Sequence, residues 1–312
     1  MQVNALLTTV DSVLERRMLR TLASYAAGDA FGVAYEYLQV RVPVDPTSMG
    51  SRADWPHGGV SDDTLLSLLT IAAVEPGAPA DSAERFLANL RRAVPQLRGL
   101  GPTTRAALGL PAPENEHLAV IGTTVIGNTN GGMMRTSLVG LGYPRERDDE
   151  RRDMVAALAR ATHTAPSAVA CAVLSSALFT AALEEPLETL SETLEREASA
   201  LHDAPADVLD LVASLAVWTP PGRGIALDPV ETLGAVAWVV THSCDALGAF
   251  TLACELGGDT DTVAALAGAL QAARSTDDEH LLSIPWIDEV LWSEIPGIST
   301  AAETLAKWRS GR

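Results

Sequence analysis

The chain has 312 residues, of which 47% are hydrophobic and 20% charged, so it has the material for a large core and lies far from disordered compositions. Its 22 basic and 40 acidic side chains give a formal net charge of −18, which disfavours binding to the phosphate backbone of a nucleic acid. Three cysteines without a C-x-x-C pair support neither a disulfide framework nor a zinc cluster, and we expect a cytoplasmic protein.

Apolar residues recur at spacings of three and four along the whole chain. The clearest runs are SVLERRMLRTLASYAAG, TLLSLLTIAAVE, AERFLANLRRAV, RRDMVAALARAT and ADVLDLVASLAVW. This is the periodicity of helices, whereas the alternation typical of strands is nearly absent. Alanine dominates many of the helix faces, which allows helix axes to approach closely. We therefore predict an all-α protein with a single compact domain over residues 1–312.

One uncharged stretch, residues 165–183, is nearly long enough to cross a bilayer. It consists mainly of Ala, Ser, Thr and Cys, and two glutamates follow it directly, so we predict a buried helix and no membrane segment. Long irregular pieces are expected at residues 42–60, 99–117 and 122–135. Loops of that length in compact helical proteins are often functional.

Two of the predicted helices begin with clusters of aspartate. Residues 58–64 read GGVSDDT before an apolar helix, and residues 257–262 read GGDTDT before another. One explanation is capping, because Ser and Asp side chains accept hydrogen bonds from free N–H groups at helix starts. The other explanation is a metal site: four carboxylates close together repel one another, and two divalent cations would cancel their charge. Oxygen ligands suit Mg²⁺ or Mn²⁺ better than zinc.

Two other kinds of enzyme fit these aspartates less well. Residues 259–263 match the aspartate string of haloacid-dehalogenase-type phosphotransferases, but that chemistry needs a preceding strand and a lysine. Lys307 is the only lysine in the chain, which also argues against a P-loop nucleotide hydrolase. An all-α prenyl-diphosphate enzyme would carry D-D-x-x-D, and Leu66 stands where its third acid belongs. Both remain minor alternatives.

Several motifs, taken in order, resemble the ADP-ribosylglycohydrolase family, which includes dinitrogenase-reductase-activating glycohydrolase and the ADP-ribosyl-arginine and ADP-ribosyl-serine hydrolases. The matching segments are Gly28–Tyr37 (G-D-A-x-G-x-x-x-E), Ser61–Thr64 (T-D-D-T), Asn130–Arg135 (G-N-G-x-x-M-R, with Thr129 at the leading glycine), Ala161–His163 (T-H) and Leu256–Thr262 (L-G-G-D-T-D-T). No acid lies between residues 95 and 101, where some relatives carry an aspartate that faces the ribose. We expect the substrate preference of this protein to differ from that of the relatives that carry this aspartate.

The resemblance implies a metal-dependent hydrolase that cleaves the α-glycosidic bond between ADP-ribose and an acceptor. It implies two Mg²⁺ or Mn²⁺ ions, with a metal-binding set of Ser61, Asp62, Asp63, Asp259, Asp261 and Thr262, in which Asp261 bridges the ions. The implied catalytic residues are Glu36, Asp62, Asp63 and Asp261. The implied substrate-binding residues are Thr129, Asn130, Gly131, Gly132 and His163. The expected partner is an ADP-ribose-containing substrate, such as an ADP-ribosylated protein.

Some of these residues also have plain structural interpretations. Glu36 could be an ordinary carboxylate at a helix end, and the Asn-Gly sequence could form a simple turn. Arg135 is expected to form a structural pair with a local carboxylate rather than to bind phosphate. Tyr35 and Tyr37 could stack on adenine, although aromatic residues beside a helix end usually belong to the core. The alternative function is a degenerate family member that binds ADP-ribose, or is structural, without turnover.

Overall fold

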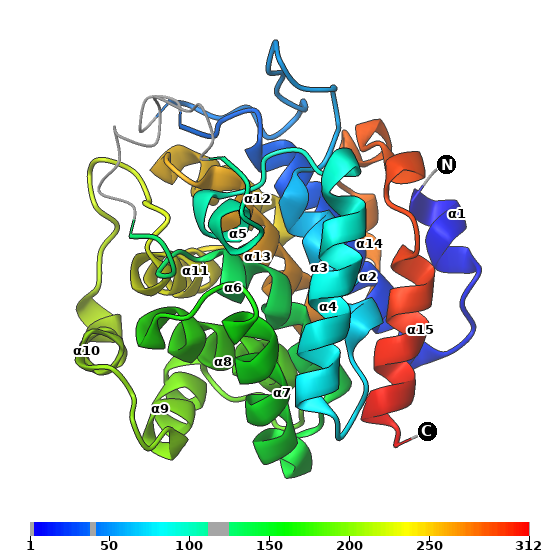
Figure 1. Ribbon diagram of the computed structural model, residues 1–312. Helices are drawn as coiled ribbons and strands as arrows, with labels where there is room; N and C mark the ends of the chain where they lie inside the picture. The colour runs from blue at the N-terminus through cyan, green and yellow to red at the C-terminus, as the bar shows by residue number, and fades with distance from the viewer. Residues whose placement is uncertain (1–2, 38–41, 112–124, 312) are drawn as a thin grey trace.

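The computed structural model describes residues 3–37, 42–111 and 125–311, which form helices joined by turns and loops (Figure 1). No strand forms in these ranges; their one isolated parallel bridge joins Ile225 and Gly258. The prediction of an all-α protein is confirmed. None of the helices in the described ranges is both long and apolar enough to cross a membrane.

The helices have these bounds. The α-helices are α1 (Val3–Thr8), α2 (Val13–Gly32), α3 (Asp62–Ala73), α4 (Pro79–Ala93), α5 (Pro102–Ala107), α6 (Gly131–Thr136), α7 (Asp148–Arg160), α8 (Pro166–Ala181), α9 (Leu190–Ala200), α10 (Ala206–Ser214), α11 (Pro229–His242), α12 (Ala246–Leu256), α13 (Thr260–Arg274), α14 (Glu279–Leu282) and α15 (Ile298–Arg309). The short 3₁₀ helices are η1 (Val94–Gln96), η3 (Ser137–Gly142), η4 (Arg145–Arg147), η5 (Leu215–Val217), η6 (Ile287–Glu289) and η7 (Trp292–Glu294).

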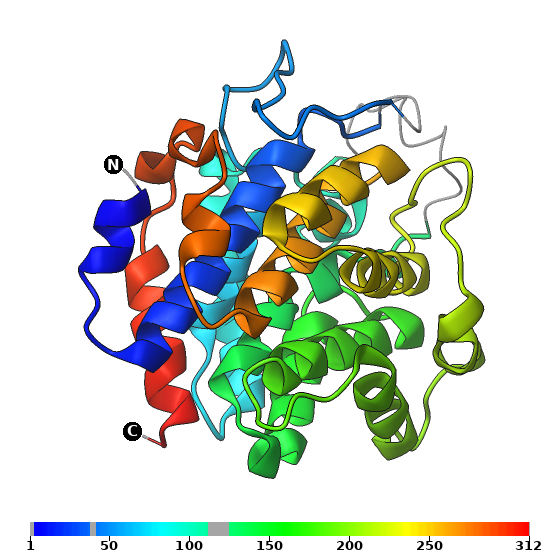
Figure 2. The same ribbon diagram turned by 180° about the vertical axis from the view of Figure 1, so that it is seen from behind.

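Helices α2, α8 and α13 form the interior. Every residue of α2 from Met18 to Gly32 is buried, and α13 is buried over almost its whole length. The two helices make the most extensive contact in the fold (Figure 2). Helix α8 is buried from Ala168 to Ala181, as the sequence predicted for this uncharged stretch. A helix that is apolar on all sides must be surrounded by others, which explains its central position.

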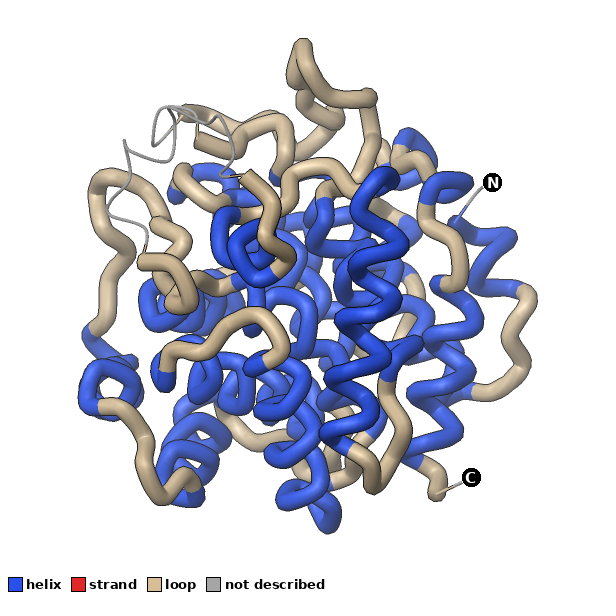
Figure 3. The backbone as a smooth tube through the Cα atoms, viewed as in Figure 1, coloured by secondary structure: helices blue, strands red, loops and turns tan. Residues whose placement is uncertain are grey.

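The remaining helices pack around this interior, and most of the longer loops gather at one end of them (Figure 3). Residues 42–60 are irregular where described, as predicted. The other two predicted loops are shorter than expected, because α5 forms within residues 99–117 and α6 begins at Gly131. Proline and glycine residues near these two helix starts obscured them in the sequence pattern. Residues 112–124 lie outside the described ranges.

Candidate active site

Helix α3 begins at a cap that combines two segments of the chain. The Ser61 hydroxyl accepts the Asp63 N–H at 3.1 Å. Asp29, from inside α2, accepts the Ser61 N–H at 2.9 Å, the Thr64 N–H at 3.0 Å and the Thr64 hydroxyl at 2.6 Å. Ser61 and Asp29 therefore satisfy the N–H groups of Asp63 and Thr64 at this helix start. These two N–H groups do not use the Asp62 or Asp63 side chains as caps.

Helix α13 begins after a tight glycine turn. Gly257 and Gly258 have φ values of 72° and 83°, and a Cβ on Gly258 would lie 2.1 Å from the carbonyl oxygen of Ile225. The Asp259 N–H donates to that carbonyl oxygen at 2.9 Å, which fixes the turn. Asp259 is the N-cap residue, but its side chain makes no capping hydrogen bond. Capping therefore does not explain the aspartates of this second start.

The two helix starts meet in space because α2 and α13 cross very closely. A Cβ on Gly32 would lie 2.3 Å from the Cα of Asp261, so only glycine permits this approach. The Thr260 hydroxyl donates to the Gly32 carbonyl at 2.8 Å. Across the gap to α3, the Thr262 hydroxyl donates to Asp63 Oδ2, also at 2.8 Å. The aspartate pair at the start of α3 and the pair at the start of α13 thus share one site, although about 200 residues separate the two pairs in sequence.

This site opens into a cavity of about 420 Å³. Every residue of the predicted metal-binding set lines it: Ser61, Asp62, Asp63, Asp259, Asp261 and Thr262. Glu36 also lines it, as do four of the five predicted substrate-binding residues: Thr129, Asn130, Gly131 and His163. Gly132 is not among the lining residues and packs instead against the His163 side chain, 3.1 Å from where its own Cβ would lie.

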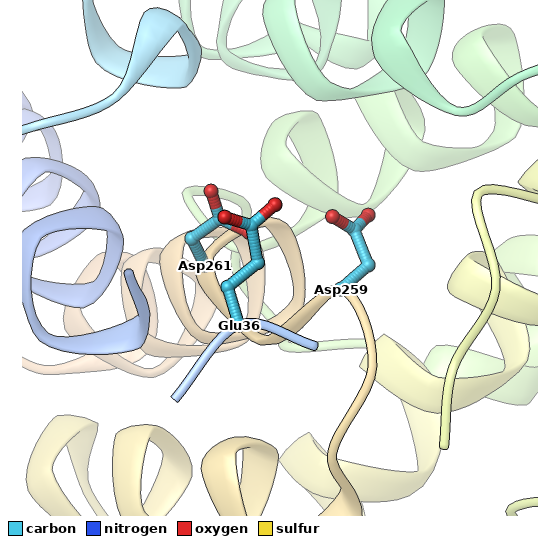
Figure 4. Close-up of side chains that lie close together, drawn as sticks. All are labelled: Glu36, Asp259 and Asp261. Carbon is cyan, nitrogen blue, oxygen red and sulfur yellow. The ribbon is translucent and has the colours of Figure 1, made fainter. Parts of the chain in front are cut away.

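Three carboxylates that line the cavity lie close together (Figure 4). One oxygen from each of Glu36, Asp259 and Asp261 lies within 4.8 Å of the other two. The Asn130 amide donates to Asp259 Oδ2. Asp261 Oδ1 is buried and has no hydrogen-bond partner among the described residues, which is costly for a carboxylate oxygen. The resemblance implied that Glu36 is catalytic and lies beside the metals, and the structure places it next to Asp259 and Asp261.

The buried carboxylates strongly favour their protonated forms in the absence of a cation. Burial, with added repulsion from Asp29 and Asp259, raises the pKa of Asp62 to about 8. Burial raises the pKa of Asp63, Asp259 and Asp261 as well, and their mutual repulsion adds to it. These groups are hard oxygen donors, and one of their oxygens lacks a partner. The residues present therefore fit divalent cations such as Mg²⁺ or Mn²⁺.

Glu36 is held at the cavity by an ion pair. Arg52 Nη1 lies 2.8 Å from Glu36 Oε2, and the Glu36 side chain retains 18% of its exposure. Burial, together with the nearby Asp259, raises the pKa of Glu36 to about 7, against the opposing effect of Arg52. A carboxylate that titrates near neutral pH can exchange a proton with a reacting group. Glu36 therefore lies at the cavity as an ion-paired carboxylate with a raised pKa.

The loop before α6 is held by hydrogen bonds to other parts of the protein. The Asn130 N–H donates to the Leu227 carbonyl at 2.9 Å, and its side-chain amide bonds Thr232 and Asp259. This N–H is therefore not free to bind a ligand. Gly131 remains at the cavity wall.

A buried chain of hydrogen bonds supports the same loop. The Thr129 hydroxyl bonds Thr103 and His163 Nε2, each at 2.9 Å. The other ring nitrogen of His163 lies 2.8 Å from the Thr162 hydroxyl. Burial and the positive charge of Arg135 lower the pKa of His163 to about 3, so this ring is neutral at physiological pH. Thr129 and Thr162 engage both ring nitrogens, so His163 supports the loop and brings no charge to the cavity wall.

Arg135 and the two tyrosines have roles that sequence alone did not settle. Arg135 is fully buried and pairs with no carboxylate in the described part of the chain: it donates to the Leu158 carbonyl and the Thr162 hydroxyl and lies over the Phe86 ring. The predicted pair with a carboxylate is wrong, although the role is structural. Tyr35 packs against Phe31, whereas Tyr37 lines the cavity.

Sequence reasoning assigned no role to Asp29, Arg52 or Trp55. Asp29 was visible as an acid inside an apolar helical run, which is a costly position unless the acid is bonded. Arg52 and Trp55 lie in the irregular segment after Glu36 and carried no recognisable pattern. Both line the cavity, and the Arg52 guanidinium lies 5.7 Å from the centre of the Trp55 ring.

Comparison with known proteins agrees with this architecture. The family model described as ADP-ribosylglycohydrolase matches residues 11–308. The chain is 29% identical over 245 residues to the uncharacterized protein YegU of Escherichia coli (strain K12), covering 68% of each chain. It is also similar to a solved structure described as an ADP-ribosylglycohydrolase-related protein complex, with a TM-score of 0.71, 26% identity and coverage of 94% of this chain and 98% of the other. The chain belongs to the ADP-ribosylglycohydrolase family.

Proposed function

We propose that this protein is a metal-dependent hydrolase that cleaves the α-glycosidic bond between ADP-ribose and an acceptor. The observation that carries the proposal is the cluster of Glu36, Asp62, Asp63, Asp259 and Asp261 around one cavity, with Asp261 Oδ1 buried and unpartnered. Carboxylates with raised pKa values in a cleft are typical of a catalytic site. Membership of a glycohydrolase family gives the class of reaction.

Two divalent cations would be held by Ser61, Asp62, Asp63, Asp259, Asp261 and Thr262. When bound, they would supply positive charge that orients the ribose hydroxyls and acidifies water. The protein positions these ligands through its own hydrogen bonds. Thr262 fixes the rotamer of Asp63, Asn130 fixes that of Asp259, and Asp29 holds the start of α3.

Glu36 would act as the general base. In hydrolysis, the oxygen of a water molecule bonds to the anomeric carbon while the bond from that carbon to the acceptor breaks. The proton from water passes to a Glu36 carboxylate oxygen and then to the acceptor. Burial raises the pKa of Glu36, to about 7 in the cation-free protein, which suits a group that accepts and returns a proton. Arg52 holds the carboxylate in place from the solvent side.

The remaining cavity wall would bind the rest of the substrate. Gly131 leaves space for a close approach of the ligand, and His163 offers a neutral ring beside it. We expect free ADP-ribose to bind in a cation-dependent manner and more tightly than AMP, which lacks the distal ribose. Calorimetry with both ligands, with and without EDTA, measures this. Equal affinities that EDTA does not change would contradict a metal-bound ribose.

Turnover is tested with a panel of ADP-ribosylated peptides and nucleosides in the presence of Mn²⁺, Mg²⁺ or EDTA. We expect hydrolysis that depends on the cation and is lost in Asp261→Asn. Cation-dependent binding of ADP-ribose without turnover of any substrate would instead identify a family member that binds the ligand only. The absence of both ADP-ribose binding and turnover would refute both functions.

A further inference from the structure

A second cavity, of about 480 Å³, is lined by residues of α9, α11 and α13 and by the segment around η5 (the α-helices are labelled in Figure 1). It shares no described lining residue with the active-site cavity. Helix α13 contributes to both cavities, with Asp261 in its first turn and Arg274 as its last residue. The rise of an α-helix puts these two residues about 20 Å apart, so the second cavity is a separate place in the fold.

Aromatic rings in fixed positions line this cavity. Trp238 and His242 stack, with ring centroids 4.2 Å apart and planes 23° apart, and His242 Nδ1 donates to the Trp238 carbonyl at 2.8 Å. The Trp218 ring lies against α11 at Gly234, where a Cβ would come within 2.7 Å of it. These rings are in place without a ligand, which lowers the entropic cost of binding. They offer apolar surfaces on which a planar aromatic group can pack.

The wall between α11 and α13 is held together by Gln271. Its side-chain N–H groups donate to the Val240 carbonyl at 3.0 Å and to the Ser243 carbonyl at 2.7 Å. These are carbonyl groups at the end of α11, where a basic side chain could otherwise bind. Gln271 therefore takes the place at the end of α11 that the nearby Arg274 could have filled.

Arg274 lines the cavity with an unused guanidinium. Of the arginines in the described ranges, it is the one partly buried case whose side chain makes neither a hydrogen bond nor an ion pair within the protein. A guanidinium offers five N–H donors in a planar arrangement that matches a carboxylate or a phosphate. Hydrogen bonds between such charged groups are stronger than neutral ones. Arg274 thus provides the cavity with a place for an anion.

The geometry points to a second ligand site in this cavity, which takes a small aromatic anion. The ring of the ligand would pack against Trp218 and Trp238, and its carboxylate or phosphate would accept hydrogen bonds from Arg274. The cavity volume lies within the range of about 300 to 1,000 Å³ that is usual for small-molecule sites. This site does not depend on the hydrolase activity proposed above.

The test is calorimetry on the full chain in EDTA, so that no cation at the active site binds the added anions. The probes are 1-naphthylacetate, 1-naphthyl phosphate, the uncharged 1-naphthylacetamide and the non-aromatic cyclohexylacetate. We expect saturable binding of at least one naphthalene anion, and at least about tenfold weaker binding of the amide and of cyclohexylacetate. Tighter binding of the phosphate assigns the site to phosphorylated aromatic compounds, and tighter binding of the carboxylate assigns it to aromatic acids.

Four variants locate the site. Arg274→Gln should weaken binding of the naphthalene anion about tenfold or more, and Trp238→Leu should weaken it independently of the charge. The matched control is Arg160→Gln, because Arg160 is the last residue of α7 as Arg274 is of α13, but is exposed and outside the cavity. This control and Asp261→Asn should leave the affinity unchanged.

Three results would overturn the inference. The first is the absence of saturable binding for both naphthalene anions, and the second is equal affinity for the uncharged amide. The third is an affinity that Arg274→Gln does not change or that Asp261→Asn abolishes, since the anion would then bind elsewhere. None of these results bears on the proposed hydrolase, which has its own tests.

Discussion

The metal-free protein should lose stability as the pH rises through neutrality. The pKa of Asp62 is about 8 and that of Glu36 about 7 in the folded state, chiefly because of burial. In the unfolded chain such carboxyls titrate near pH 4. Between these values the folded state binds more protons than the unfolded state, so the free energy of unfolding falls with increasing pH. The stabilisation is complete below about pH 4 and is lost by about pH 8.

The size of the effect follows from the number of protons involved. One proton bound only in the folded state changes the free energy of unfolding by about 1.4 kcal/mol per pH unit. Between about pH 5.5 and 8.0, Asp62 alone accounts for about 3 kcal/mol and Glu36 for about 2 kcal/mol. These amounts are large beside a typical total of about 5 to 15 kcal/mol. Divalent cations bind the ionised carboxylates and should restore the stability at the higher pH.

Urea unfolding in EDTA at about pH 5.5 and 8.0 measures the fall, and a repeat in Mn²⁺ at the higher pH measures the recovery. Asp62→Asn should reduce the fall by about 3 kcal/mol, because it removes one of the titrating groups. Asp210→Asn, on an exposed face of α10, is the matched control and should leave the fall unchanged. Metal-free stability that is constant or increases over this range would refute the reasoning.

Three substitutions test other parts of the site. Asp261→Asn should abolish Mn²⁺ binding, which elemental analysis measures, and should reduce hydrolysis by orders of magnitude. Because the change relieves charge repulsion, the metal-free variant should melt at or above the wild-type temperature in calorimetry. Retained activity would exclude a bridging role for Asp261. Asp29→Ala should cost at least about 2 kcal/mol in urea unfolding, since the N–H groups of Ser61 and Thr64 lose their buried acceptor; an unchanged midpoint would show that α3 is capped without it. Gly32→Ala should lower the free energy of unfolding by about 1 to 3 kcal/mol through overpacking, and it should weaken Mn²⁺ binding because the new Cβ forces Asp261 to move. Unaltered Mn²⁺ affinity in isothermal titration would show that the crossing of α2 and α13 does not position the site.

Much of the local structure could be predicted from the sequence because helical periodicity depends on residues three or four apart. The all-α class, the buried helix α8 and the two aspartate-rich helix starts all follow from such short-range patterns. The motifs also pointed to the family. Short helices such as α5 and α6 were missed, because six residues next to glycine or proline carry too little periodicity.

Only the tertiary structure shows that those aspartates lie at one cavity. Periodicity indicates which face of a helix is buried but not which distant helix covers it. The crossing of α2 and α13 at Gly32 could therefore not be predicted from the sequence, where Gly32 is only a small residue in a helix. The same applies to Asp29, which caps a helix that begins about 30 residues later, and to Arg52, which pairs two acids at the cavity. Hydrogen bonds and ion pairs of this kind join atoms that are close only after packing, and packing depends on the whole chain at once.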